Sequence, residues 1–160
     1  METIVPNCDI LINKEGVMFY RGVEILRRKT VALFYQHLQM DAAGRYLIEI
    51  GKERCYVSVE DTAYAVCAVS RADGRSGAEE CFHLLLSDDS TEKLNIDTLR
   101  IGKENVLYCK VKNDRFEARF SRPGYYQLAA HVDYDPLNNA YFITLNGQPH
   151  YIKYMEHRDA

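Results

Sequence analysis

One short phrase occurs twice in this chain of 160 residues, and it constrains the fold more than any other feature. Residues 34–51 read FYQHLQMDAAGRYLIEIG, and residues 125–147 read YYQLAAHVDYDPLNNAYFITLNG. Each copy begins with two aromatic residues and Gln, continues through a polar loop and ends in a β-prone run that reaches Gly. This pattern predicts a helix followed by a strand, formed twice in the same chain.

Hairpins are expected on both sides of each helix. Residues 17–25 and 106–120 each contain two β-prone runs, separated by Arg21-Gly22 in the first copy and Asn113-Asp114 in the second. The hairpins that follow the helices pair 46–50 with 55–59 and 141–145 with 150–152. We therefore predict an α+β fold with duplicated ββαββ units, mostly antiparallel sheet with two main helices. Chance similarity between two helix-plus-hairpin segments is the alternative to duplication.

The repeat also predicts how the chain is divided. The first ββαββ unit covers residues 1–60, and the second unit, with a tail, covers 106–160. Between them, 61–105 contain a strand hairpin and a polar connector with a possible short helical turn, and form either a sheet arm or a link. Since neither unit can bury both faces alone, we expect the two units to pack together.

The expected helix starts are rich in arginine. Thr30 and Ser121 each lie six residues before the Gln of the repeated phrase, and both carry the hydroxyl that is favoured at an N-cap. Cations close to a helix N-terminus oppose the helix dipole, so arginines there indicate a negative partner. That partner is either an internal carboxylate, such as Glu24 or Glu117, or an external anion. The candidate anion-binding residues are Arg27, Arg28, Thr30, Arg119, Ser121 and Arg122.

Tyrosine is the unusual residue type in this composition. The chain has twelve tyrosines and no tryptophan. Neighbouring aromatic residues point in different directions, so one ring can face the core while the other stays near the surface with a solvated hydroxyl. Tyr35 and Tyr126 are the candidate interaction-surface residues, because tyrosine is enriched in interface cores. The alternative is that the tyrosines cap a small core.

No motif specifies a reaction. A phosphate loop, a nucleophile elbow and a zinc-protease helix are all missing from the sequence. Cys81 and His83 could form a nucleophile pair on one strand, but we expect half-buried packing residues there. Two partial metal-site patterns, His37 with Asp41 and His131 with Asp133, lack a third ligand. Asp133, Asp135, Asn138 and Asn139 only partly resemble a calcium loop, so we predict a polar turn, no metal and no cofactor.

The five cysteines show no C-x-x-C pair. Cys67 and Cys81 are equidistant from Gly74 and could face each other across a hairpin. We expect them to be two small apolar residues on paired strands, because cytosolic proteins seldom keep a structural disulfide.

Charge and hydropathy indicate compartment and partners. A formal net charge of −3 does not favour a nucleic-acid partner, and no apolar run approaches the ~20 residues of a membrane span. The first ten residues do not resemble a secretory signal, so we expect a cytoplasmic location and no membrane partner. Residues 79–87, EECFHLLLS, form a strand with acidic ends and an apolar middle that could pair with a second copy. A homodimer is therefore a possible state.

Residues 12–38, INKEGVMFYRGVEILRRKTVALFYQHL, resemble the opening of the bacterial domain-of-unknown-function family numbered 1285. The family has an aromatic strand, a Gly and Ile-x-Arg before its first helix, matched here by Phe19, Tyr20, Gly22, Ile25 and Arg27. Residues 57–66 are similar to a second family stretch, which often has Pro where this chain has Ala63, and 116–129 resemble a third. The resemblance implies a soluble bacterial α+β protein with repeated ββαββ-like motifs, a conjectural signalling or interaction role, and no catalytic residue.

Three functions from different classes follow. The first is a non-catalytic cytoplasmic interaction or regulatory module that binds another protein. The second is a sensor of a small anion with a pocket at the helix N-termini. The third, an enzyme, is disfavoured because no acid/base or nucleophile constellation can be defended.

Overall fold

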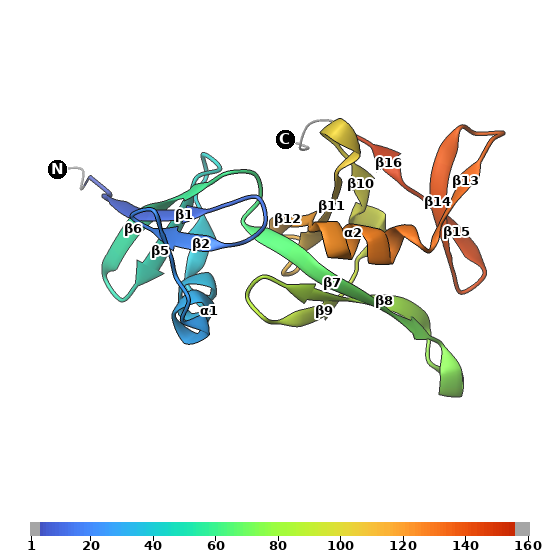
Figure 1. Ribbon diagram of the computed structural model, residues 1–160, viewed down its shortest axis with the longest axis horizontal. Helices are drawn as coiled ribbons and strands as arrows, with labels where there is room; N and C mark the ends of the chain where they lie inside the picture. Colours follow the sequence, from blue (N-terminus) through green and yellow to red (C-terminus); the bar gives the residue numbers. More distant parts are fainter. Residues whose placement is uncertain (1–3, 156–160) are drawn as a thin grey trace. The chain divides into compact units, whose positions relative to one another are not determined.

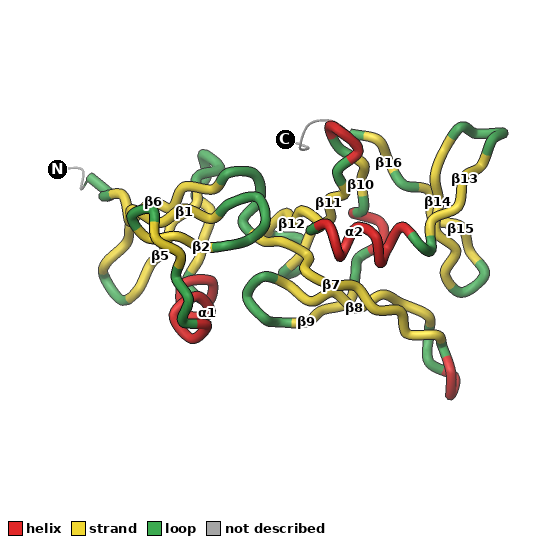
Figure 2. The backbone as a smooth tube through the Cα atoms, in the orientation of Figure 1, coloured by secondary structure: helices red, strands yellow, loops and turns green. Residues whose placement is uncertain are grey.

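The chain forms two compact units, described here from a computed structural model (Figure 1). The structure describes residues 4–155, so residues 1–3 and 156–160, at the ends of the first and last predicted units, lie outside the described residues. Unit 1 is Met1–Ala63 and unit 2 is Tyr64–Ala160. Strands predominate in both units, and each contains one α-helix in its described part (Figure 2). The predicted α+β class, with mostly antiparallel sheet and two main helices, is confirmed.

Unit 1 is a six-stranded sheet with one helix. Its elements are β1 (Asn7–Ile12), β2 (Met18–Tyr20), β3 (Val23–Glu24), α1 (Arg28–Gln36), β4 (Leu38–Met40), β5 (Tyr46–Ile50) and β6 (Glu53–Val59). The strand order is β3-β2-β1-β6-β5-β4. Neighbouring strands are antiparallel except at the centre, where β1 and β6 run parallel. Ile12, Met18 and Val31 are almost completely buried and belong to the core of this unit.

Unit 2 contains a seven-stranded sheet and a three-stranded sheet. Its first elements are β7 (Tyr64–Asp73), the 3-10 turn η1 (Arg75–Gly77), β8 (Glu80–Leu86), β9 (Thr91–Lys93), η2 (Ile96–Thr98), β10 (Arg100–Ile101) and η3 (Lys103–Asn105). The chain continues with β11 (Leu107–Val111), β12 (Phe116–Phe120), α2 (Arg122–Ala129), β13 (Val132–Asp135), β14 (Ala140–Leu145), β15 (Gln148–Tyr151) and β16 (Lys153–Tyr154). The strand orders are β16-β10-β11-β12-β7-β8-β9 and β13-β14-β15.

The four predicted hairpins are present. β2 pairs with β3, β11 with β12, β5 with β6 and β14 with β15, all antiparallel. The β14–β15 turn shows why sequence predicts such features well: Asn146 and Gly147 have φ values of 53° and 76°. A two-residue hairpin loop that follows the twist of its strands needs positive φ at both positions, and Asn-Gly tolerates this better than other pairs.

The strand order of unit 1 recurs in unit 2. In each unit the strand before the first hairpin pairs in parallel with the strand that ends the repeat: β1 with β6, and β10 with β16. β15 and β16 are separated only by Ile152, whose N–H donates to the Tyr141 carbonyl at 2.9 Å. With β15 and β16 taken as one interrupted strand, the order β12-β11-β10-β16/β15-β14-β13 matches β3-β2-β1-β6-β5-β4. The repeat therefore has six strands rather than four, and duplication itself stays a prediction.

The middle segment contributes strands to the larger sheet. The predicted strands are β7 and β8, and the predicted helical turn is η2. β7 pairs in parallel with β12, so residues 64–73 extend the sheet formed by the second repeat. The connector also holds β9 and β10, which sequence reasoning missed because strands of two or three residues show no alternation. β9 pairs with β8 at His83 to Leu85, so the middle of 79–87 is not the open edge that we expected.

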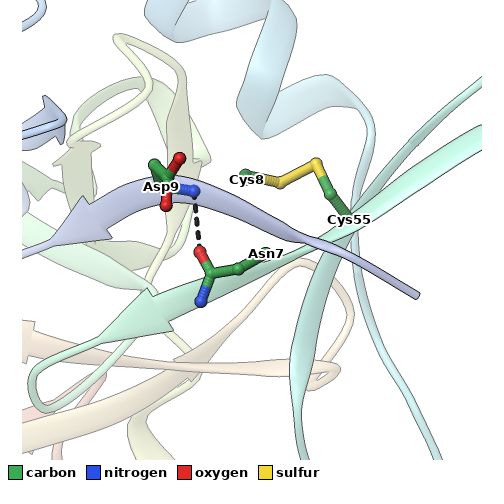
Figure 3. The surroundings of a disulfide bond; sticks show 4 residues. All are labelled: Asn7, Cys8, Asp9 and Cys55. Atoms are coloured by element: carbon green, nitrogen blue, oxygen red, sulfur yellow. Dashed lines mark hydrogen bonds between the residues drawn. A yellow bond between two sulfur atoms is a disulfide. The ribbon is translucent and has the colours of Figure 1, made fainter. Parts of the chain in front are cut away.

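Two cysteines form a disulfide that sequence reasoning did not predict. Cys8 on β1 is bonded to Cys55 on β6, across 47 residues of sequence (Figure 3). Cys67 and Cys81 are outside any disulfide, as expected, but they do not face each other. Cys81 lies opposite Ala72, because the β7–β8 loop covers residues 74–79 and is therefore not centred on Gly74.

No helix in the described part of the chain has the length and apolar character needed to cross a membrane.

Candidate functional site

The start of α1 differs from the prediction. The helix begins at Arg28, and its N-cap is Arg27, which makes no side-chain capping bond. Thr30 is therefore not a cap; it is the third residue of the helix, and its N–H donates to the Arg27 carbonyl at 3.1 Å. The predicted position was three residues too late, because the repeated phrase aligns Thr30 with Ser121 although the helices start at different points. The first turn of α1 contains no acidic residue.

The start of α2 agrees with the prediction. Ser121 is the N-cap, and its hydroxyl accepts a hydrogen bond from the Gly124 N–H at 3.2 Å. Arg122 is the first helical residue and is exposed, whereas Arg119 lies on β12, opposite Tyr108 and Ala65. Gly124 lets the helix approach β7 closely, since a Cβ there would lie 2.7 Å from the Val66 carbonyl oxygen. The two arginine clusters belong to different units.

Of the two predicted interaction tyrosines, one is in the core. Tyr35 is 3% exposed, and its hydroxyl donates to the Ala63 carbonyl at 3.0 Å. The prediction that Tyr35 forms a surface is wrong, because the ring and the hydroxyl are both used inside unit 1. Its neighbour Phe34 is the half-buried ring of the pair. Tyr126 on α2 is 63% exposed and packs edge-on against Tyr125, so this residue does lie at the surface.

Exposed tyrosines are concentrated in the last part of unit 2. Those in the described residues after α2 begins are Tyr126, Tyr134, Tyr141, Tyr151 and Tyr154. Tyr134 and Tyr141 face each other across β13 and β14, with ring centroids 5.2 Å apart. Tyr151 on β15 contacts Phe142 in the same way at 5.5 Å. These cross-strand pairs hold the rings in place while about half of each tyrosine remains accessible to a partner.

Asp135 organises the loop between β13 and β14. Its carboxylate accepts hydrogen bonds from the Tyr151 hydroxyl at 2.8 Å and from the Asn138 side chain at 2.7 Å. These hydrogen bonds hold the pKa of Asp135 below its usual range, and the same bond from Tyr151 raises the pKa of that tyrosine. The residues that partly resembled a calcium loop therefore make a polar turn, in which the carboxylate is already occupied by protein donors.

A groove of about 1060 Å³ lies within unit 1. Its lining residues come from the segment before β1, from strands β1, β2, β5 and β6, from helix α1 and from Ile25 between β3 and α1. Ile48 pairs with Cys55 across β5 and β6, so the Cys8–Cys55 disulfide forms part of the groove wall. The aliphatic residues that line the groove are Ile4, Val5, Ile10, Ile25, Ile48 and Ile50.

The same groove has polar groups along part of its wall. Thr30 and Phe34, one turn apart on α1, both line it. Lys52, Glu53 and Arg54 line it at the β5–β6 turn, so the charged part carries two cations and one carboxylate. Sequence reasoning did not find this groove, because its residues come from five separate segments that only the fold brings together.

The candidate chemical groups from the sequence have structural partners. Cys81 Sγ lies 3.5 Å from His83 Nε2, but in the described residues no carboxylate hydrogen bonds to His83 to orient it as a base. Asp41 accepts a hydrogen bond from Arg45 Nε at 2.9 Å. The Nδ1 atom of His131 lies 3.4 Å from an Arg71 guanidinium nitrogen. Residues 4–155 contain no group of three or more His, Cys, Asp or Glu side chains placed to hold a metal ion.

Solved structures with this fold include two from a family without an assigned function. A DUF1285 family protein from Silicibacter pomeroyi DSS-3 has a TM-score of 0.75 and 18% identity, covering 92% of this chain and 81% of its own. A DUF1285 family protein from Shewanella baltica OS155 has a TM-score of 0.61 and 20% identity, covering 76% of this chain and 90% of its own. The likeness confirms, at the level of fold, the resemblance that residues 12–38, 57–66 and 116–129 predict. Neither a protein-family model nor a curated protein matches the chain.

Proposed function

We propose that this chain, which has the fold of DUF1285 family proteins, is a non-catalytic module that binds another protein through the sheet β13-β14-β15. The observation that supports this proposal is the concentration of exposed tyrosines on that sheet and the neighbouring α2 and β16. Tyrosine gives a large contact area with few rotatable bonds, and the rings here are already ordered by their cross-strand partners.

The edge of this sheet favours one kind of partner. β13 is the end strand of the three-stranded sheet, so an extended segment of another protein can pair with its outer side. β13 carries Asp133 and Asp135, and the second copy of an antiparallel β13 pair would bring like charges together. A basic extended segment would instead place cations beside the carboxylates of Asp133 and Asp135. We therefore expect the partner strand to carry Lys or Arg, and we expect a homodimer, if one forms, to use another surface.

A non-catalytic role is supported by how the candidate reactive groups are used. Cys109 is buried, and burial raises its thiol pKa far above the usual range, so this thiol is held in its unreactive form. Cys81 is also buried, and its His83 neighbour is not oriented by a carboxylate in the described residues. Packing accounts for both cysteines without a reaction.

A capture experiment with matched variants tests the proposal. The full chain is immobilised as wild type, as Tyr134→Ser/Tyr141→Ser and as Tyr20→Ser, and each is exposed to bacterial lysate. Tyr20 is 45% exposed on β2 of unit 1, which makes it a control for losing an exposed tyrosine elsewhere. We expect a protein retained by the wild type and by Tyr20→Ser but lost from the double variant. Retention by all three proteins would contradict the proposal, as would retention by none.

We also propose a bacterial cytoplasm as the compartment, as the sequence predicts. The disulfide makes this proposal testable, because a reducing cytoplasm keeps most protein thiols reduced. Rapid acid quenching and alkylation of producing cells would trap Cys8 and Cys55 in their cellular state. We expect both thiols to be alkylated in growing cells, and a disulfide that persists in unstressed cells would overturn the cytoplasmic assignment.

A further inference from the structure

We propose that the groove of unit 1 binds a small amphipathic anion, namely an aliphatic chain that ends in a carboxylate or a phosphate. This inference is independent of the protein-binding surface proposed above, because every residue that lines the groove belongs to unit 1.

The wall of the groove suits an aliphatic chain. Six of its fifteen lining residues are Ile or Val, and several large apolar side chains there are left accessible: Ile4 is 90% exposed, Tyr20 45% and Ile50 41%. The volume of about 1060 Å³ is at the upper end of the range for small-molecule pockets. Moving each CH₂ group of a chain from water into such a wall is favourable, so a chain of ten or more carbons has a large driving force for binding.

The groove is open because α1 is too short to cover the sheet. The helix has nine residues and is therefore about 13 Å long, whereas six strands spaced ~4.8 Å apart make a wider surface. Only Val31 and Tyr35 of α1 are fully buried. Ile50 of β5 lines the groove and is left exposed, whereas Ile10 of β1, which also lines it, is buried at its base.

Charge around the groove favours an anionic head group. Lys52 and Arg54 line the groove, and Glu53 is the carboxylate among the lining residues. Thr30 also lines the groove and lies in the first turn of α1, which contains no acidic residue. Cations therefore outnumber carboxylates by two to one among the lining residues, and the Thr30 hydroxyl adds a neutral hydrogen-bond donor.

The wall is also held in place before any ligand arrives. β1 pairs in parallel with β6 and is cross-linked to it in the oxidised protein, and β5 and β6 pair through Ile48 with Cys55 and Ile50 with Glu53. A preformed wall of this kind lowers the entropic cost of binding. Because the groove lies against a sheet face and a helix rather than along a free strand edge, it fits a flexible small molecule better than an added β-strand.

Isoleucine methyl NMR on the full chain tests the proposal directly. Five of the lining residues are isoleucines, whereas Ile101, Ile143 and Ile152 lie in unit 2. Dodecanoate, dodecyl phosphate, dodecanol and inorganic phosphate are titrated separately, below the concentrations at which micelles form. We expect saturable shifts of the groove methyls with the two anionic chains, at most weak shifts with dodecanol, and none with inorganic phosphate. Whichever of dodecanoate and dodecyl phosphate binds more tightly identifies the head group that the groove prefers.

Matched variants separate specific binding from general apolar adsorption. Ile50→Glu puts a carboxylate into the groove. Leu33→Glu puts a carboxylate on α1 at a position of similar exposure, 44%, that does not line the groove. We expect at least a tenfold weaker affinity for dodecanoate in Ile50→Glu and an unchanged affinity in Leu33→Glu. The double variant Lys52→Glu/Arg54→Glu should lower the affinity for dodecanoate about fivefold and leave any shifts caused by dodecanol unchanged.

Several results would overturn the proposal. Absence of groove shifts with both anionic chains would do so, and so would equal shifts of the unit 2 methyls or equal affinity in Ile50→Glu and Leu33→Glu. Groove methyls that shift with protein concentration alone, together with a dimer mass by light scattering, would assign the groove to a second copy of the chain instead.

Discussion

Arg100 and Glu117 form a buried ion pair that links the first strand of the second repeat to its third. Their side chains are 6% and 14% exposed, and the guanidinium donates to both carboxylate oxygens, at 3.3 and 3.2 Å. Arg100 also donates to the Met155 carbonyl at 2.8 Å and stacks on Tyr108, 4.2 Å from the ring centroid. One side chain thus connects β10, β11 and β12 with the end of β16 in a network that leaves few donors unused.

Removing the arginine should be costly. Arg100→Met leaves Glu117 buried without its cation, and we expect a loss of about 3–5 kcal/mol in the free energy of unfolding, measured by urea denaturation. Arg100→Met/Glu117→Leu should recover part of this loss, because no unpaired charge remains. Arg75→Met is the control, since the Arg75–Asp73 pair is exposed and should change stability by less than about 1 kcal/mol. A small loss in Arg100→Met would show that the pair is not a stabilising link.

Reduction of the Cys8–Cys55 disulfide should destabilise unit 1. A cross-link that closes 47 residues lowers the entropy of the unfolded chain by an amount equivalent to about 4 kcal/mol at 25 °C. We expect Cys8→Ser/Cys55→Ser, and the wild type in reductant, to lose most of that stability in calorimetric melts. Cys67→Ser, which changes a cysteine outside any disulfide, is the control and should melt close to the wild type. A double variant as stable as the oxidised protein would mean that the cross-link does not constrain the unfolded chain.

Local signals in the sequence were sufficient to predict the hairpins and the N-cap of α2. They failed to predict the N-cap of α1. Asn146-Gly147 and Ser121 act through their immediate neighbours, so their roles can be read from a few residues. Thr30 carries a hydroxyl like that of Ser121, yet α1 begins two residues before it, at Arg28. Tyr35 was placed at the surface because an aromatic pair does not itself reveal which ring faces the core.

The features that sequence reasoning missed depend on contacts between distant segments. Cys8 and Cys55 give no spacing signal for their disulfide, because the parallel pairing of β1 with β6 alone brings them together. The groove needs Ile10, Thr30 and Ile50 to meet from three different elements. The candidate anion-binding residues come from both repeats, which belong to different units, and their role stays a prediction.

Gly124 should be intolerant of even the smallest side chain. An added Cβ would lie 2.7 Å from the Val66 carbonyl oxygen, which is backbone of β7 and cannot move aside cheaply. We expect Gly124→Ala to lower the free energy of unfolding by about 1–3 kcal/mol, although alanine is the better helix former. Gly44→Ala provides the comparison, because a Cβ added there would have nothing within 4 Å and only the φ of +81° opposes the change, at about 1 kcal/mol. Equal or higher stability of Gly124→Ala would show that α2 can shift on β7.

Asp88 should make the stability of unit 2 sensitive to acid. Its carboxylate accepts a hydrogen bond from Lys112 Nζ at 2.8 Å and others from Ser90. Burial alone would raise the pKa of Asp88, but the hydrogen bonds from Lys112 and Ser90 outweigh it and lower that pKa below 3.8. A carboxyl with a lowered pKa in the folded state stabilises the fold above the unfolded pKa, and this contribution is lost as pH falls through the folded value.

The sign of this linkage fixes the expected pH profile. Between pH 7 and about pH 5 the contribution of Asp88 is complete, and below about pH 4 the urea midpoint of the wild type should fall. Asp88→Asn loses the charge-assisted bond to Lys112, so it should be about 2 kcal/mol less stable than the wild type at pH 7 and nearly equal to it at pH 2. Glu79→Gln changes an exposed carboxylate of the same unit, and its urea midpoint should depend on pH in the same way as that of the wild type. A difference between Asp88→Asn and the wild type that stays constant from pH 7 to pH 2 would show that packing of the side chain, rather than its charge, stabilises this part of the sheet.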